Sequence, residues 1–199
     1  MKALVVFCHP THDSFTGASL QRVLAGLAKG GHDVRLVDLY AEGFRPELSR
    51  DDLALHTSDW RAHPDLRPDV RSHVDDLTWA EALVFVYPTW WSGQPAMLKG
   101  WIDRVLVSGV AWQLPEGSNR IRPMLQHVRR LVVVTSHGST KWVNALEGEG
   151  GKRVVGRALR VLCSPRCRTR WVALYTIDRA PLAKRLAFLD RVERRLQRL

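Results

Sequence analysis

Residues 82–106 read ALVFVYPTWWSGQPAMLKGWIDRVL, and this stretch decides the fold. It begins with a continuous run of apolar and aromatic side chains, which is typical of a strand buried on both faces of a sheet. A polar loop with two tryptophans follows. Leu98, Trp101, Ile102 and Val105 then recur at the spacing of one helical face. A buried strand, a loop and an amphipathic helix in this order predict one unit of a parallel α/β sheet.

The same pattern repeats on either side of this stretch. Buried strands are predicted in residues 2–8, 33–39, 82–87, 130–136 and 171–177. Helices are predicted over residues 20–27, 74–80, 98–106, 155–162 and 182–199, and Gly30 and Gly31 stop the first of them. Five strands that alternate with five helices predict a flavodoxin-like α/β fold. We expect a doubly wound five-stranded parallel sheet of order 2-1-3-4-5, with helices on both faces, in one domain over residues 1–199.

Residues 40–74 interrupt this alternation. The stretch is polar and contains Pro46, Pro64, Pro68 and the isolated large aromatic Trp60. We expect irregular or weakly helical structure here. A long excursion of this kind is often functional, and a segment that only covers the surface explains it equally well.

Composition and charge narrow the class of protein. The chain has 199 residues, of which 45% are hydrophobic and 25% charged, as expected of a globular protein with a substantial core. No apolar run approaches the length of a membrane span, and we expect a cytoplasmic protein. Three cysteines, Cys8, Cys163 and Cys167, are too few for a disulfide framework or a zinc site, so no metal is expected.

The formal net charge is +10, and the surplus lies at one end of the chain. Residues 1–119 carry 11 basic and 15 acidic side chains, whereas residues 120–199 carry 19 basic and 5 acidic ones. A coding bias toward arginine on solvated faces explains this, and so does attraction of an anionic ligand. Nucleic acid is not expected, because the sequence has no known nucleic-acid-binding motif.

In an open parallel sheet, ligands bind outside the carboxyl ends of the strands, which here carry three loops. The first, residues 9–17, has neither a dinucleotide-binding nor a P-loop glycine pattern. It offers His9 and the hydroxyls of Thr11, Ser14 and Thr16 just before a helix N-terminus, where a phosphate would fit. Helix capping by Ser14 or Thr16 is the structural alternative.

The second loop, residues 88–95, places Trp90 and Trp91 together. Two indoles among backbone amides indicate a site for a planar aromatic ligand, and packing against a helix or a subunit is the alternative. The third loop, residues 136–142, contributes His137 and Gly138.

Two motifs carry a resemblance to a known family. HPTHDSFT after the first strand and YPTWWSGQPAMLKGWIDRVL after the third resemble the flavodoxin-like NAD(P)H dehydrogenase (quinone) family. This resemblance implies a flavin-dependent oxidoreductase in which a hydride passes from NAD(P)H through the bound flavin to a quinone or similar acceptor, in a ping-pong sequence. It implies FAD, with FMN as the close alternative, and a homodimer.

The resemblance also assigns residues to the flavin. His9, Ser14, Phe15 and Thr16 would hold its phosphate and, in FAD, the adenosine end. The flavin ring would lie against the loops that follow the third and fourth strands, which supply Pro88, Thr89, Trp90, Trp91, Thr135, Ser136, Gly138 and Trp142. The sequence departs from the mammalian members after the fourth strand, where it reads TSHGSTKW without their tyrosine and downstream histidine. His137 is then the candidate catalytic residue, with an exposed or hydrogen-bonded bystander as the alternative.

Two questions stay open at this stage. A flavin-binding regulatory or ancillary subunit, for example of a potassium-efflux system, would use the same binding residues with little turnover. NADH and NADPH are not distinguished by the sequence.

Overall fold

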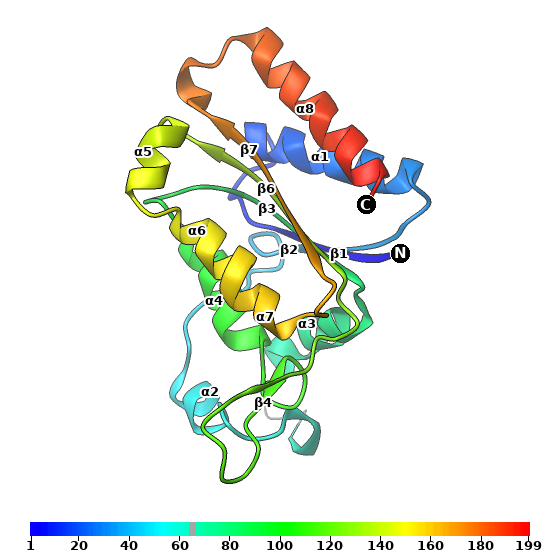
Figure 1. The fold of residues 1–199 in the computed structure, drawn as a ribbon, viewed down its shortest axis with the longest axis vertical. Coiled ribbons are helices and arrows are strands. Elements are labelled where there is room, and N and C mark those ends of the chain that lie inside the picture. Colours follow the sequence, from blue (N-terminus) through cyan, green and yellow to red (C-terminus); the bar gives the residue numbers. More distant parts are fainter. Residues whose placement is uncertain (64–66) are drawn as a thin grey trace.

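The computed structural model of the protein describes residues 1–63 and 67–199, so Pro64 of the interrupting stretch lies outside it. Its centre is a parallel sheet of order β2-β1-β3-β6-β7, as predicted (Figure 1). The strands are β1 (Lys2–Phe7), β2 (Asp33–Asp38), β3 (Ala82–Pro88), β6 (Arg130–His137) and β7 (Arg168–Tyr175).

Helices cover both faces of the sheet. On one face lie α1 (Phe15–Lys29) and α8 (Leu182–Gln197), which pack against each other. The other face carries α3 (Pro68–Trp79), α4 (Ala96–Val105) and a long helical segment formed by α6 (Gly150–Arg153), the π-helical η3 (Val154–Leu159) and α7 (Arg160–Leu162). Figure 1 shows the two helical layers on opposite sides of the strands.

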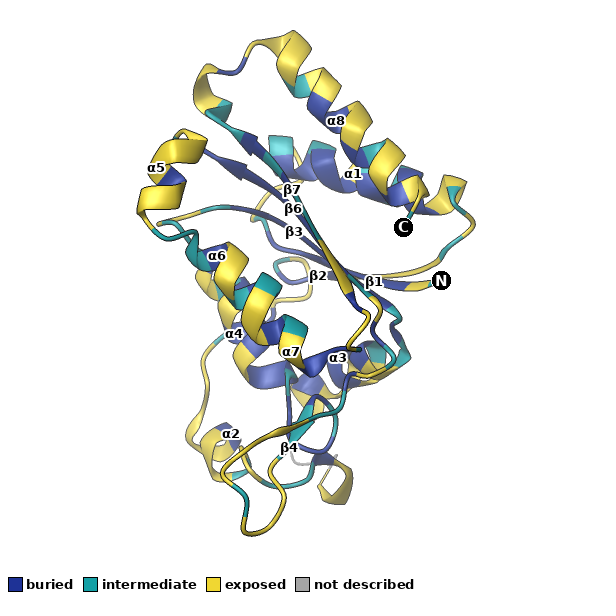
Figure 2. Ribbon diagram, viewed as in Figure 1, coloured by how far each residue is buried: buried dark blue, intermediate teal, exposed yellow. Residues whose placement is uncertain are grey.

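The apolar alternation within each strand divides the core in two. Leu4 and Val6 of β1 face the cluster beneath α3 and α4, whereas Ala3 and Val5 face the cluster beneath α1 and α8. All four side chains are fully buried. Figure 2 shows the buried strands between helices whose outer surfaces are exposed. Burial on both faces explains why the strands read as unbroken apolar runs.

Several boundaries differ from those predicted. β7 covers residues 168–175 rather than 171–177, because its pairing with β6 starts at Arg130 and Arg168. An edge strand tolerates charged residues, so arginines in residues 168–170 do not end it. The predicted helix over residues 155–162 begins at Gly150 instead.

The stretch of residues 40–74 is more regular than expected. It contains α2 (Arg50–Ala54) and the short η1 (Trp60–Ala62), and α3 begins at Pro68, where proline is favoured in the first turn. Trp60, the tryptophan of this polar stretch, is buried in the core. Three further short elements were not predicted: α5 (Lys141–Leu146), η4 (Ile177–Arg179) and a two-stranded ribbon of β4 (Trp112–Gln113) and β5 (Arg122–Pro123).

Within the described residues, no helix is long and apolar enough to cross a membrane. The same residues contain no group of three or more His, Cys, Asp or Glu side chains that would hold a metal ion. All three cysteines are buried free thiols.

Candidate active site at the carboxyl ends of the strands

The loop after β1 wraps around the N-terminus of α1. Ser14 caps this helix, because its hydroxyl accepts a hydrogen bond from the Gly17 amide at 3.0 Å and donates to the Thr11 carbonyl at 3.0 Å. A Cβ atom at Gly17 would lie 1.9 Å from the His12 carbonyl oxygen, so only glycine permits this turn. The capping interpretation of Ser14 is therefore correct.

The amides of Phe15 and Thr16 have no hydrogen-bond acceptor in the described part of the chain. They belong to the first turn of a 15-residue helix, where the helix dipole favours an anion. The Phe15 side chain packs on Phe188 of α8, with ring centroids 5.6 Å apart. The Phe15 ring is therefore engaged in helix packing, whereas its backbone amide has no acceptor in the described part of the chain.

His9 connects the first loop to the second. Its Nδ1 lies 2.6 Å from the Thr11 carbonyl oxygen, and its ring centroid lies 6.3 Å from that of Trp90. The two loops that were predicted to share a ligand are thus neighbours.

The loop after β3 is a tight hairpin. The amides and carbonyls of Trp90 and Gly93 pair with each other at 3.2 and 3.0 Å. Trp91 and Ser92 between them have φ angles of +46° and +59°, as in a type I′ turn, although neither is glycine. The turn presents the Trp91 ring fully to solvent (102% exposed). Backbone strain beside an exposed indole is typical of a binding loop.

Thr89 is held in place by the neighbouring strand. Its amide donates to the Ser136 carbonyl at 2.9 Å, and its hydroxyl lies 3.0 Å from the Thr135 hydroxyl. Thr135 is buried, so it positions Thr89 rather than facing the loops itself.

The hairpin after β3, the end of β6 with the turn that follows it, and the α5 segment form a cavity of about 590 Å³, and residues 9–17 of the first loop do not line it. It is lined by Thr89, Trp90, Trp91, Ser92, His137, Gly138, Ser139, Asn144 and Glu147. Five of the nine, Thr89, Trp90, Trp91, His137 and Gly138, are residues that the sequence assigned to the site.

Like Asn144, His137 is a buried polar residue of this cavity. Its side chain stacks on Tyr175, with ring centroids 4.7 Å apart and planes 14° from parallel. Neither ring nitrogen makes a hydrogen bond of good geometry to the described residues. Burial lowers the pKa of His137, and the nearby Asn144, Glu149 and Glu147 only partly oppose this. The imidazole is therefore neutral near pH 7, with one N–H to donate and one nitrogen to accept.

Four lining residues were missed by the sequence reasoning: Ser92, Ser139, Asn144 and Glu147. Asn144 and Glu147 lie on α5 and just after it, and Glu147 accepts a hydrogen bond from the Ser92 hydroxyl. The sequence did contain one signal for this helix, because Thr140, a favoured N-cap residue, stands directly before it. Trp142 lies on the same helix but is exposed and does not line the cavity.

Cys8 follows β1 near this edge of the sheet. Burial raises its pKa to about 12, so the thiol stays protonated and is not a nucleophile near neutral pH.

Comparison with known proteins shows which family the chain resembles. Residues 1–160 match a family described as having a flavodoxin-like fold. The chain is 32% identical over 150 residues to the protein of Rattus norvegicus named NAD(P)H dehydrogenase (quinone) 1, a match that covers 69% of this chain and 54% of the rat protein. It is 35% identical over 121 residues to an uncharacterized NAD(P)H oxidoreductase of Haemophilus influenzae, covering 60% of this chain and 57% of that protein.

Among solved structures, the chain resembles the NAD(P)H:quinone oxidoreductase of Methanothermobacter marburgensis, with a TM-score of 0.81, 29% identity, and coverage of 100% of this chain and 98% of that one. The chain spans about half the length of the curated relatives that it matches.

Proposed function

Because the chain belongs to the flavodoxin-like fold family, we propose that it is a flavin-dependent NAD(P)H oxidoreductase with a quinone or a similar electron-poor compound as acceptor. The observation that carries this proposal is the 590 Å³ cavity at the carboxyl ends of β3 and β6, walled by Trp90, Trp91 and His137. A planar redox ring fits such a cavity, which combines indole surface with a few polar groups. Bound there, a flavin supplies hydride transfer in a ping-pong sequence, and the protein supplies binding and orientation.

The phosphate end of the flavin has a matching set of donors. The free amides of Phe15 and Thr16 at the start of α1 would bind it, as helix N-termini bind phosphates elsewhere. Ser14 holds the loop in the required shape through its bonds to Thr11 and Gly17. His9 would contribute its Nε2, because Nδ1 is already engaged by the Thr11 backbone.

The ring end would lie against the hairpin after β3 and the turn after β6. Pro88 and Thr89 would line one edge of the ring, and Thr135 and Ser136 hold Thr89 there. Gly138 would lie at the opposite edge, and a Cβ atom there would lie 3.0 Å from a carboxylate oxygen of Asp178, so glycine allows this turn to pack against Asp178. Trp91 would cover the face where the nicotinamide and the acceptor alternate.

His137 would be the protein's proton carrier in this reaction. A buried neutral imidazole whose hydrogen-bonding capacity is unused can donate to the ring or to an acceptor oxygen in the cavity. The stack on Tyr175 fixes its plane.

We propose FAD as the bound flavin, with FMN as the alternative, and a cytoplasmic homodimer. The exposed Trp91 and Trp142 rings support the dimer, because large exposed aromatics are frequent at interfaces. A partner subunit would cover them.

The absorption spectrum of the purified protein tests the proposal, and the mass of the released cofactor identifies the flavin. We expect a visible flavin spectrum, reduction by NAD(P)H, and parallel-line kinetics with a soluble quinone. A protein that binds flavin without turnover would contradict the enzyme and favour a regulatory subunit. A protein that takes up neither flavin would contradict the site.

A matched pair of variants tests the cavity. Trp91→Ala removes an exposed ring that makes no contribution to the core, so we expect normal folding and a rise in KM for the quinone. Leu53→Ala removes another exposed apolar side chain, on α2 away from this edge, and should change neither KM nor kcat. Equal kinetics of the two variants would contradict a role of Trp91 at the ring.

A further inference from the structure

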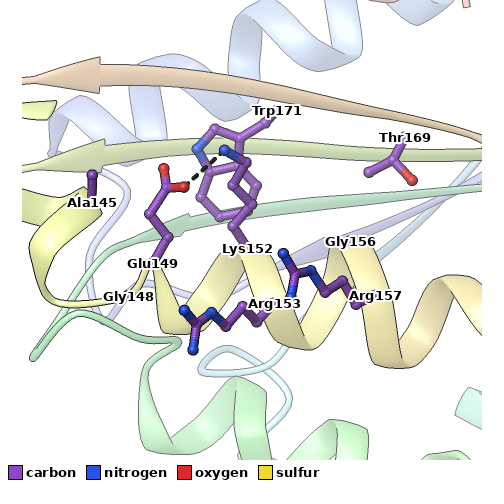
Figure 3. Close-up of a pocket in the computed structure, with 9 residues that line it drawn as sticks. All are labelled: Ala145, Gly148, Glu149, Lys152, Arg153, Gly156, Arg157, Thr169 and Trp171. Atoms are coloured by element: carbon purple, nitrogen blue, oxygen red, sulfur yellow. Dashed lines mark hydrogen bonds and ion pairs between the residues drawn. The ribbon is translucent and has the colours of Figure 1, made fainter.

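A second cavity lies between the α6–η3 helical segment and the edge strand β7, and the proposed function does not use it (Figure 3). Its volume is about 370 Å³. The helical side supplies Lys152, Arg153 and Arg157, and β7 supplies Thr169 and Trp171. We call this cavity the basic cleft.

Positive charges outnumber negative charges in the basic cleft. Lys152 pairs with the carboxylate of Glu149 at 2.9 Å. Arg153 and Arg157 have no carboxylate within ion-pair distance among the described residues, and both are exposed. Figure 3 shows the Arg157 side chain extending along the helix toward Arg153, one turn before it. The cleft therefore carries two positive charges that have no carboxylate partner among the described residues, which favours an anion of charge about −2.

The surroundings increase this preference. A neighbouring cavity of about 270 Å³ shares Lys152 and Trp171 with the basic cleft and adds Lys141, Arg191 and Arg195. On β7 itself, between Thr169 and Trp171, burial lowers the pKa of Arg170, and the positive charges of Arg130, Arg195 and Arg168 add to this effect. Much of the basic surplus of residues 120–199 is thus concentrated around one edge of the sheet.

The shape of the cleft indicates a small ligand with a ring. Gly156 leaves space in its wall, because a Cβ atom there would lie 4.0 Å from both Lys152 Cγ and Thr169 Cγ2, an ordinary contact distance. Its backbone does not require glycine, so the missing side chain keeps the cleft open. The half-buried Trp171 ring supplies a flat surface for a base. Gly156 and Arg157 belong to a π-helical segment, and such segments are frequent at functional sites.

We propose that the basic cleft binds a nucleoside phosphate. Arg153 and Arg157 hold the phosphate, since guanidinium groups match phosphate oxygens in geometry and charge. Trp171 stacks on the base, and Thr169 offers a hydroxyl. A single nucleotide suits a cavity of this size better than a polymer, which would need an extended groove.

The ligand has two possible sources, and the position of the cleft makes both reasonable. Residues 144–149 supply walls to both cavities: Asn144 and Glu147 to the first, Ala145, Gly148 and Glu149 to the basic cleft. The phosphate is either the 2′-phosphate of NADPH, whose nicotinamide occupies the first cavity, or that of a separate nucleotide. The first source rests on the proposed function; the second does not.

Isothermal titration calorimetry with adenosine 2′,5′-bisphosphate tests the site without any need for turnover. Against the unchanged protein at low ionic strength, we expect Arg153→Ala and Arg157→Ala each to weaken binding about tenfold. Gly156→Leu fills the cleft without changing its charge and should abolish binding. Arg194→Ala, which removes an exposed arginine from α8 on the opposite face of the sheet, should leave the affinity unchanged.

Three results would overturn the proposal. The unchanged protein could fail to bind the bisphosphate. Arg194→Ala could weaken binding as much as Arg153→Ala and Arg157→Ala do, or Gly156→Leu could bind with full affinity. Binding of a single-stranded DNA oligonucleotide that outcompetes the bisphosphate and weakens equally in Arg194→Ala would also overturn it, in favour of a diffuse surface for nucleic acid.

Steady-state kinetics then separate the two sources. If Arg157→Ala raises KM for NADPH about tenfold and leaves KM for NADH unchanged, the cleft holds the 2′-phosphate of the reductant, and the site is supported. If calorimetry shows specific binding but both KM values stay unchanged, the site is supported for a separate nucleotide. A protein without flavin or turnover would defeat the proposed function, while the calorimetric result would stand.

Discussion

Two regions of this protein are rich in arginine, but the arginines of one are buried in ion pairs and those of the other are exposed. Beneath the sheet, Asp52 of α2 meets Arg104 of α4 and Arg67, and all three residues are buried. In the basic cleft over β7, Arg153 and Arg157 lie exposed without a carboxylate partner among the described residues. Both regions are rich in charge, yet one is part of the interior and the other faces a cavity.

The buried network satisfies its groups almost completely. Arg104 donates from Nε to Asp52 at 3.0 Å and from Nη1 to the Arg45 carbonyl at 2.7 Å, and pairs with Asp69 at 2.8 Å. Burial alone would raise the pKa of Asp52, but hydrogen bonds from Ser49 and Arg104 outweigh it and lower the pKa. Every charge in this region already has a partner.

The difference shows how to separate structural charge from binding charge. A buried ion pair must be fully satisfied by the fold, because an unpaired buried charge is costly. An exposed cation costs little without a partner, so it is free for a ligand. His137 is the intermediate case, a buried polar group that makes no hydrogen bond of good geometry to the described residues. We therefore expect substitutions in the first region to affect stability and those in the second to affect binding.

The largest effect is expected at Asp52. Asp52→Ala leaves Arg104 and Arg67 buried without their carboxylate and removes the reciprocal cap with Ser49, so the free energy of unfolding should fall by about 3–5 kcal/mol. Urea unfolding measures this. Asp51→Ala, one residue earlier and exposed, is the control and should cost less than about 1 kcal/mol. Similar losses in the two variants would show that the network does not contribute as described.

The next effect concerns pH. Burial lowers the pKa values of His137 and His73 below the ordinary value, so the unfolded chain binds protons more readily than the folded one as the pH falls through about 6.5. The free energy of unfolding should therefore keep its full value above that pH and should fall by about 1–2 kcal/mol between pH 7.5 and 5.5. Unfolding curves at several pH values measure it. Stability that rises on acidification over this range would contradict the direction.

A smaller change of opposite sign is expected for His137→Leu. Removing a buried polar group without a hydrogen bond should raise the free energy of unfolding by about 1 kcal/mol, while turnover with a quinone falls about tenfold or more. Unfolding and steady-state assays on the same sample test both. Loss of stability together with loss of turnover would identify His137 as a structural residue.

The smallest effect on stability is expected in the basic cleft. Arg157→Ala should change the free energy of unfolding by no more than about 0.5 kcal/mol, because the side chain is exposed and pairs with no carboxylate in the described structure. Thermal and urea unfolding test this. A loss comparable to that of Asp52→Ala would place Arg157 in the stabilising framework.

Much of the candidate site at the carboxyl ends of the strands was predictable, because its signals are local. The apolar runs that form β1, β3 and β6 each end in a polar loop, and parallel strands bring those ends to the same edge. His9, Trp90 and His137 could therefore be assigned to one site before any contact was known. Asn144 and Glu147 could not, because a short capped helix carries too weak a periodicity to predict.

The sequence alone determined the strand order, the positions of the turns and the excess of positive charge beyond residue 120. Only the tertiary structure decided where that charge is used. Arg104 and Asp52 are 52 residues apart along the chain and meet in the interior. Phe15 turns toward α8, and Arg153 and Arg157 line an open cavity together with residues of β7. Local sequence determines periodicity and turns, whereas the pairing of a charge depends on contacts between distant segments that form only when the sheet and its helices are packed.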